Sequence, residues 1–249
     1  MGKLLNQPIY QLLGGAWTRQ IPWYASIGNH AARSVDETLR NLDQWLAHKP
    51  ALVKIRFDAD RTTRDLDIPG DIAKARAVRK HVGENFPLAF DANNNYSVQG
   101  AIRVGRILEE LGYEWFEEPV QHYHVKALEK VADALDIAVS AGEQEYTLQG
   151  IARLIDAGVS IIQPDIVKTG GFSGLMEMAA LAKTYGVDVV PHQTQPSIGT
   201  AATLHFLAAL AHRHYPAELN ERPHADGVGV QDVVFEEPLR SREGLFHLS

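Results

Sequence analysis

The sequence predicts an α/β fold in which eight parallel strands and the helices between them close into a barrel. Acidic or imidazole residues recur at steps of 22 to 27 residues, and each ends a short apolar run. One strand, one helix and two loops take about this many residues, because parallel strands need a helical crossover. Barrel strand ends meet on one face, where active sites are built, so the spacing also predicts an enzyme. The recurring residues are Asp91, Glu117, Glu143, Asp165, His192 and Glu218.

Eight apolar segments are predicted to be the strands. Continuously apolar strands with helical patterns between them are typical of a parallel sheet that is covered on its outside. No linker, low-complexity run or change of composition divides the chain, so we expect a single barrel. The predicted strands are residues 21–26, 51–57, 87–91, 114–117, 137–141, 159–163, 187–191 and 216–219.

Helix boundaries are predicted from caps and terminal glycines. Ser34 and Glu37 have the spacing of a capping box and open a helix over residues 34–48. Polar caps and glycines give three further helices. These run from Asp71 to Gly83, from Ser97 to Gly112 and from Ser173 to Gly186.

Two segments flank the predicted barrel, which covers residues 16–222. Residues 1–15 have the pattern of a short helix that Gly14 and Gly15 end. Residues 223–249 form a tail with alternating apolar residues and no strong helical pattern, so the last strand is expected to lack its helix. The alternating residues are Val228, Val230, Val233 and Phe235.

Composition excludes several classes of protein. With 45% hydrophobic and 22% charged residues in 249, the chain is an ordinary globular protein, long enough for one barrel or two smaller domains. A net charge of −7 and eleven scattered His predict no nucleic-acid face. The absence of Cys excludes disulfides and thiolate metal sites and fits a cytoplasmic protein. No apolar stretch approaches the roughly 20 residues that span a bilayer.

Three carboxylates predict a metal site. Asp91, Glu117 and Glu143 end the third, fourth and fifth predicted strands, and they would repel one another unless a cation neutralises them. Oxygen ligands favour a hard ion, so Mg²⁺ is expected, with Mn²⁺ as a substitute. Each carboxylate taken alone could equally be a solvated loop residue or a helix cap. Three in register on consecutive strands favour the metal.

A second constellation predicts acid–base chemistry. His192 and Asp165 end adjacent predicted strands, and a neighbouring carboxylate fixes the tautomer of a His and raises its proton affinity. His192 is therefore the candidate general base or acid. The structural alternative is that His192 only follows Pro191 at a strand end.

Lys54 and Arg56 lie two residues apart in the second predicted strand, so their side chains share one face. Cations on the inward face are costly unless they meet anions. They are candidates to neutralise a substrate carboxylate, with Lys54 as a possible second base, although a solvent-facing pair is the alternative. Glu218 is a candidate to hydrogen-bond the substrate carboxylate, and Glu221 is its rival.

Together these motifs resemble the enolase superfamily. The resemblance covers about residues 3–240, and the Asp165–His192 pair is similar to the mandelate racemase subgroup rather than the muconate cycloisomerase subgroup, which has a Lys on strand six. It rests on Lys54-x-Arg56, Asp91-Ala-Asn93, Glu117-Glu118-Pro119, Gly142-Glu143, Pro164-Asp165, Lys168-Thr-Gly170-Gly171 and Pro191-His192. It implies a modified TIM barrel, (β/α)₇β, with Mg²⁺ held by Asp91, Glu117 and Glu143, and a base that acts through an ene-diolate.

The resemblance also implies proton abstraction alpha to a carboxylate. A positioned base supplies roughly 10²–10⁴-fold, so charge stabilisation of the intermediate must supply most of the rate. We expect loss of a β-hydroxyl, which makes the protein an acid-sugar dehydratase; racemisation or epimerisation is the alternative. Among polar residues near the strand ends, Asn93, Gln144 and Glu221 are the candidate substrate contacts.

Members of this superfamily carry an N-terminal α+β capping domain that closes over the site, and this domain is expected to be missing from the sequence. Metal binding and the core constellation should survive without it, because strand ends provide them. Specificity and water exclusion should suffer. A truncated barrel with little turnover is therefore a second hypothesis. The expected partner is a small carboxylate, with no nucleic acid and no membrane, and the chain is expected to form a homo-oligomer.

Overall fold

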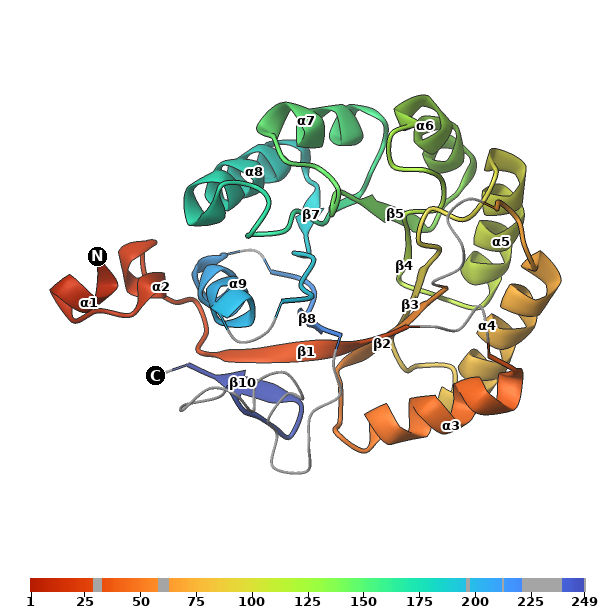
Figure 1. Cartoon of the computed structure of the whole chain (residues 1–249), viewed down its shortest axis with the longest axis horizontal. Coiled ribbons are helices and arrows are strands. Elements are labelled where there is room, and N and C mark those ends of the chain that lie inside the picture. The colour runs from red at the N-terminus through yellow and green to blue at the C-terminus, as the bar shows by residue number, and fades with distance from the viewer. Residues whose placement is uncertain (29–32, 58–62, 196–197, 212, 221–238, 249) are drawn as a thin grey trace.

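The computed structural model describes residues 1–28, 33–57, 63–195, 198–211, 213–220 and 239–248. Within these ranges, parallel strands form a ring and helices surround it on the outside (Figure 1). Eight strands, β1 to β8, alternate with seven helices, α3 to α9. The predicted α/β fold is confirmed, and the order of elements is that of a (β/α)₇β barrel.

The strand limits lie within two residues of their predicted positions. They are β1 (Gln20–Ile27), β2 (Leu52–Arg56), β3 (Leu88–Asp91), β4 (Trp115–Glu117), β5 (Ala138–Ala141), β6 (Ile161–Ile162), β7 (Asp188–Val189) and β8 (Ala217–Leu219). The helices between them are α3 (Val35–Leu46), α4 (Ile68–Val82), α5 (Val98–Glu110), α6 (Val125–Ala134), α7 (Leu148–Asp156), α8 (Gly171–Tyr185) and α9 (Ile198–Ala209).

Strand pairing puts the predicted site residues at one end of the ring. The order runs from β7 through β6, β5, β4, β3 and β2 to β1, and β8 pairs with the other side of β1 in parallel. Asp91 lies beside both Arg56 and Glu117 in the register, so these three side chains end neighbouring strands at one level. Between β7 and β8, the Gln193 N–H donates to Glu218 Oε2 at 2.9 Å and links the two ends of the ring.

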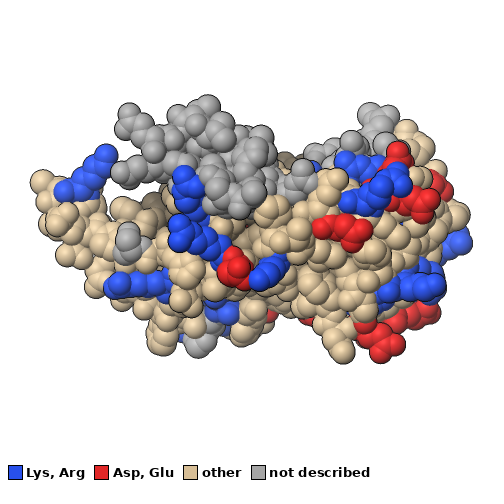
Figure 2. Space-filling model, turned by 90° about the horizontal axis from the view of Figure 1, so that it is seen from below, with Lys and Arg blue, Asp and Glu red and all other residues tan. Residues whose placement is uncertain are grey.

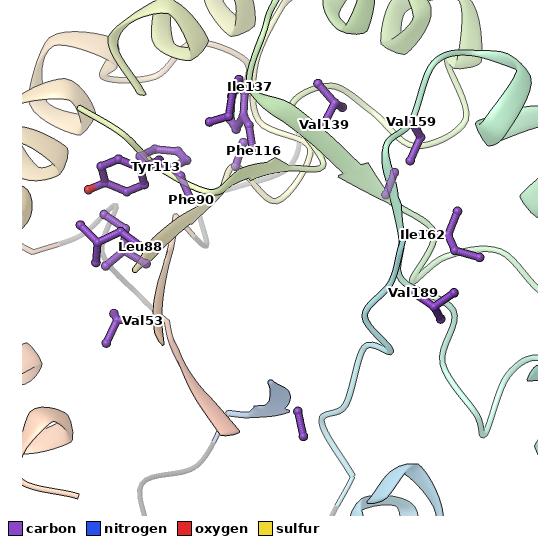
Figure 3. Close-up of a cluster of buried hydrophobic side chains, with 14 of the residues drawn as sticks. Val53, Leu88, Phe90, Tyr113, Phe116, Ile137, Val139, Val159, Ile162 and Val189 are labelled. Atoms are coloured by element: carbon purple, nitrogen blue, oxygen red, sulfur yellow. The ribbon is translucent and has the colours of Figure 1, made fainter. Parts of the chain in front are cut away.

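The residues on the outward faces of the strands form the main core. Figure 3 shows Val53, Phe90, Phe116, Ile162 and Val189 pointing from the strands toward the surrounding helices. These side chains are buried, and each fully buried residue of this size contributes about 1.5–3 kcal/mol. This packing holds the strands in register and therefore fixes the positions of their ends.

The inside of the barrel has two layers of different chemistry. The layer nearer the N-terminal ends of the strands is apolar and includes Tyr24, Leu52, Trp115, Ile161 and Val190. Trp115 is fixed there by edge contacts with Tyr24 and Tyr215, at ring centroid distances of 5.5 and 5.2 Å. The next layer toward the C-terminal ends of the strands is polar and almost fully buried. It contains Ser26, Lys54, Glu117, Ser140, Gln163 and Glu218. The site is built on this polar layer.

Some helix starts are as predicted. Ser34 and Glu37 form the capping box of α3, and the Ser97 side chain accepts from the Gly100 N–H at the start of α5. Two starts are wrong. Asp67, not Asp71, caps α4 by accepting from the Gly70 N–H at 3.0 Å, and Asp71 is buried inside the helix, where it accepts from the Tyr96 hydroxyl at 2.8 Å.

The start predicted at Ser173 is also wrong, because α8 already begins at Gly171 after the left-handed Gly170. A single helix over residues 1–15 is wrong as well. That segment forms α1 (Gly2–Leu5) and α2 (Ile9–Leu12), because Asn6 adopts a left-handed conformation that ends the first helix. Pro8 then precedes the second helix as its N-cap.

The described end of the tail forms a hairpin that the sequence analysis missed. Strands β9 (Ser241–Arg242) and β10 (Leu245–His247) pair with each other, and β10 pairs antiparallel with the beginning of β1. The alternating residues predicted at Val228, Val230, Val233 and Phe235 lie outside the described residues.

On the face shown in Figure 2, Lys and Arg side chains and Asp and Glu side chains are interspersed with uncharged surface. Where described residues are visible on this face, the basic side chains have acidic neighbours and do not gather into one patch of the kind that binds a nucleic-acid backbone. None of the helices within the described ranges combines the length and the hydropathy needed to cross a bilayer.

Candidate active site

A polar cavity of about 210 Å³ lies at the C-terminal end of the strands. Side chains from β2, β3 and β8 and from the loops after β5 and β7 line it. They are Lys54, Arg56, Asp91, Asn93, Glu143, His192, Thr194 and Glu218. The structure therefore brings six of the predicted catalytic and metal residues around one space: Lys54, Arg56, Asp91, Glu143, His192 and Glu218.

A larger cavity, of about 510 Å³, lies between α8 and α9 and is lined mainly by apolar side chains. It opens at the beginning of β7, at the end of the barrel opposite the predicted residues. The candidate active site is the smaller cavity, because the acidic and basic side chains converge there.

Two of the three predicted metal ligands, Asp91 and Glu143, line the polar cavity, and the third, Glu117, is buried beside Lys54. Asp91 and Glu117 end β3 and β4, and Glu143 follows β5. Burial raises the pKa of Asp91 well above its usual value, and the charges of Glu117 and Glu143 raise it further. Asp91 is therefore close enough to both carboxylates to be strongly affected by them.

Each of the three carboxylates accepts from a side-chain amide. Asn93 donates to Asp91 Oδ2 at 3.1 Å, and Gln144 donates to Glu143 Oε1 at 2.6 Å. Gln163, which follows β6, donates to Glu117 Oε2 at 2.6 Å. A side-chain amide donates a hydrogen bond to a carboxylate oxygen without adding positive charge.

The donor set fits a hard divalent cation, since it offers carboxylate oxygens and contains excess negative charge around Asp91. In this conformation no three His, Cys, Asp or Glu side chains of the described residues are grouped closely enough to hold a metal. Glu117 is instead engaged by Lys54, and Glu143 lies 3.3 Å from His192 Nε2. A cation would have to compete with these two contacts.

His192 and Asp165 form the predicted pair. The Nδ1 atom of His192 lies 2.8 Å from Asp165 Oδ2, and the Val167 N–H donates to the other oxygen, Oδ1, at 2.9 Å. Burial alone would raise the pKa of Asp165, but the hydrogen bonds from His192 and Val167 hold it below its usual value. This carboxylate is ionised and fixes the orientation of the imidazole.

The imidazole is a strong base in this setting. Burial alone would lower the pKa of His192, but the Asp165 hydrogen bond and the charges of Glu218 and Glu143 raise it to about 9. Nε2 faces Glu143 and belongs to the lining of the cavity. This nitrogen is the one that can reach a ligand.

Lys54 lines the cavity, but its ammonium is engaged by carboxylates. Its Nζ atom lies 2.6 Å from Glu117 Oε1, 3.0 Å from Glu218 Oε1 and 3.9 Å from Asp91 Oδ2. Burial alone would lower the pKa of Lys54, but Glu117 and Glu218 raise it well above its usual value. In turn, burial would raise the pKa of Glu218, whereas Lys54 and His192 lower it to about 2. Lys54 is thus a fixed buried cation.

The predicted substrate contacts have different positions. Asn93 lines the cavity and Gln144 hydrogen-bonds a carboxylate that lines it. Glu221 lies outside the described residues. Asn95, one of the polar residues near the strand ends, donates to the carbonyl of Phe57, the residue after β2, at 2.7 Å.

Sequence reasoning missed two residues that contact Glu117. The indole of Trp115 donates to Glu117 Oε2 at 3.1 Å, and Gln163 donates to the same oxygen. Trp115 could have been found, because a residue two positions before Glu117 on a strand shares its face. Gln163 comes from two strands away, and only the closed barrel brings it to Glu117.

Comparison with known proteins identifies the domain. The family model described as "Enolase C-terminal domain-like" matches residues 37–249. An arabinonate dehydratase from Saccharolobus solfataricus is 29% identical, with 98% of this chain and 62% of that protein covered. A D-galactarolactone cycloisomerase from Agrobacterium fabrum is 33% identical, with 84% of this chain and 54% of that protein covered.

A solved structure agrees with this match. The mandelate racemase/muconate lactonizing protein from Paracoccus denitrificans Pd1222 is 57% identical, with a TM-score of 0.94, and 100% of this chain and 66% of that chain are covered. A second structure of that protein is complexed with magnesium. The chain thus spans about two thirds of this solved relative and less of the two curated ones. It belongs to the enolase superfamily, as an enolase C-terminal-like barrel whose homologues are acid-sugar dehydratases, cycloisomerases and racemases of the mandelate racemase subgroup.

Proposed function

We propose that the barrel is a Mg²⁺-dependent acid-sugar dehydratase that removes the proton alpha to the substrate carboxylate and then eliminates a β-hydroxyl. The observation that carries this proposal is the His192–Asp165 pair, with a 2.8 Å hydrogen bond, at a cavity that is also lined by carboxylates and cations. A base, negative ligands and positive groups are together in one small polar space.

His192 Nε2 takes the alpha proton, and the electron pair of the C–H bond moves into an ene-diolate of the substrate. Asp165 accepts from Nδ1–H, so Nε2 of the neutral imidazole is the atom that acts as the base. With a pKa of about 9, this neutral form becomes well populated as the pH approaches 9. The C–O bond at the β carbon then breaks, and the proton on His192 leaves with the hydroxide as water. The enol that remains tautomerises to a 2-keto acid.

Stabilisation of the negative charge that develops on the substrate must lower the activation barrier by more than the general base does. General-base catalysis supplies roughly 10²–10⁴-fold, about 3–5 kcal/mol, whereas whole enzymes supply roughly 8–23 kcal/mol. Asp91, Glu117 and Glu143 would hold Mg²⁺, or Mn²⁺ in its place. When bound, the ion acts as a Lewis acid toward the substrate carboxylate. Arg56 is the cation of the chain that lines the cavity without being fixed between Glu117 and Glu218.

Elimination is favoured over racemisation by the nature of the other basic groups. Racemisation needs a second group that exchanges a proton on the opposite face of the alpha carbon. Lys54 is held in buried ion pairs with a pKa well above its usual value, and a guanidinium such as Arg56 does not deprotonate in proteins. Neither residue is suited to that exchange, so His192 is the basic side chain left for the chemistry among the described residues that line the cavity.

Cycloisomerisation is a second candidate, because a D-galactarolactone cycloisomerase is 33% identical to this chain. The proton abstraction would be the same, and the oxygen that leaves the β carbon would belong to a ring. The two functions differ in the substrate and not in the role of His192.

A panel of aldonates, aldarates and their lactones, assayed for 2-keto acid with Mg²⁺ and with EDTA, tests this proposal. Parallel reactions in D₂O report exchange at the alpha carbon even if elimination fails. His192→Asn should abolish both readouts, whereas His81→Asn, which alters a partly exposed His paired with Asp43, should change neither. Undiminished exchange in His192→Asn would remove this residue from the mechanism.

A further inference from the structure

Glu117 is held by three donors in the polar layer of the barrel. Oε1 accepts from Lys54 Nζ at 2.6 Å, and Oε2 accepts from Trp115 Nε1 at 3.1 Å and from Gln163 Nε2 at 2.6 Å. All four residues are at most 1% exposed. A buried polar group needs such partners within the protein, because water cannot supply them.

The two carboxylate oxygens of Glu117 differ in how many lone-pair sites they still have for another hydrogen bond or a cation. Each carboxylate oxygen has about two lone-pair sites. Trp115 and Gln163 occupy both sites of Oε2, whereas Lys54 occupies one site of Oε1. Oε1 is therefore the oxygen with remaining capacity, and a divalent cation would compete with Lys54 for this atom.

The two hydrogen bonds to Oε2 fix its position, because the side chains that donate them cannot easily move. Trp115 lies two residues before Glu117 on β4, and its ring is fixed between Tyr24 and Tyr215 in the apolar layer. Gln163 follows β6 and reaches Glu117 from two strands away. By contrast, the amides on Asp91 and Glu143 come from their own loops, at Asn93 and Gln144.

We propose that Trp115 and Gln163 are positioning residues that hold Glu117 by Oε2 so that Oε1 is presented to the cation. This inference rests on the proposed assignment of Glu117 as a metal ligand and extends it to two residues that do not contact the metal. Partners of this kind typically change metal affinity by roughly 10–100-fold when they are removed.

The test measures Mg²⁺ affinity by calorimetry in the absence of substrate. Trp115→Phe and Gln163→Met each remove one donor and should weaken binding by roughly tenfold or more. Trp23→Phe is the matched control, because Trp23 is equally buried and its indole nitrogen has no hydrogen-bond acceptor among the described residues. Its Mg²⁺ affinity should match that of the parent even if its urea midpoint falls.

A spectroscopic readout separates positioning from a general loss of packing. The chain has four Trp, so a ¹H–¹⁵N spectrum contains few indole signals, and each can be assigned by its loss in the corresponding Phe variant. The Trp115 signal should shift during a Mg²⁺ titration, and the Trp23 signal should not. If Trp115→Phe does not fold, the Trp115 signal is assigned by elimination from the Phe variants of the other three Trp, and the inference is then tested by Gln163→Met and by this titration.

Three results would overturn the inference. One is Mg²⁺ affinity within twofold of the parent in both donor-deletion variants, and another is a Trp115 signal that does not respond to Mg²⁺. The third is a parent chain that binds no Mg²⁺, which would also remove the metal from the proposed function. If Mg²⁺ binding behaves as expected while the substrate panel gives no product, only the proposed dehydratase function fails.

Discussion

Replacing Lys54 by Met should destabilise the barrel strongly. The ammonium lies 2.6 Å from Glu117, 3.0 Å from Glu218 and 3.9 Å from Asp91, and the side chain is 1% exposed. At an effective dielectric constant of about 20, the shortest contact alone corresponds to ~6 kcal/mol of attraction, offset by several kcal/mol for taking the ammonium out of water. Removing one member of a buried pair leaves uncompensated charge, so we expect a loss of about 3–5 kcal/mol.

Urea unfolding followed by circular dichroism measures this effect. The midpoint of Lys54→Met should fall by more than about 1 M. Lys49→Met is the matched control, since Lys49 pairs with Glu243 on the surface, where both side chains are largely exposed and such pairs contribute about 0–1 kcal/mol. A loss in Lys54→Met no greater than in Lys49→Met would refute the view that Lys54 is a fixed structural cation.

The pH dependence gives a second check with a definite sign. In the parent, Glu218 has a folded pKa of about 2, below its usual 4.5, so its stabilisation is present above pH 4.5 and is lost as the pH falls toward 2. Without Lys54, the folded pKa values of the buried carboxylates rise, and the folded state binds protons more readily than the unfolded state. The deficit of Lys54→Met should therefore shrink as the pH is lowered from 7 to about 5.

Three further predictions concern the site, the scaffold and the surface. Mg²⁺ affinity should increase from pH 6 to 9 with release of protons, because the pKa of Asp91 is raised and that of His192 is about 9; equal heats in buffers of different ionisation enthalpy would contradict this. Arg79→Met should lower the free energy of unfolding by about 3 kcal/mol, because its guanidinium donates to the carbonyls of Leu111, Gly112, Gly83 and Phe86; an unchanged urea midpoint would disprove it. We also expect a homo-oligomer by light scattering that Trp17→Ser weakens, since Trp17 is 72% exposed; a monomeric parent would refute this.

The barrel was predictable because its signal repeats. Each strand from β3 to β8 has an acidic or imidazole residue at or within three residues of its end, so an error in one element does not disturb the others. One error occurs where two residues of one type compete locally. Asp67 and Asp71 can both cap a helix, and the choice depends on Tyr96, which contacts Asp71 only in the folded chain. The hairpin of β9 and β10 was missed because its strands are too short to show an alternating pattern.

The candidate site, like the fold, was predictable from the sequence only in part. Strand ends and alternation placed Asp91, His192 and Arg56 correctly at one cavity. They could not separate Lys54 from Arg56, because both share a face and differ in depth: Lys54 lies within the buried polar layer and Arg56 lies above it. That depth depends on how the strands tilt and close, which no single strand encodes.

The way β1 is paired has a consequence for synthesis. This strand has β8 as a neighbour, and its first residues pair with β10. A ribosome must therefore deliver the chain from β1 through β8 before the ring can close. Until then β1 has an unpaired edge, which makes nascent chains candidates for chaperone binding. Pulling on stalled translation intermediates should show the full mechanical resistance of the barrel only after the residues of β8 to β10 have left the exit tunnel.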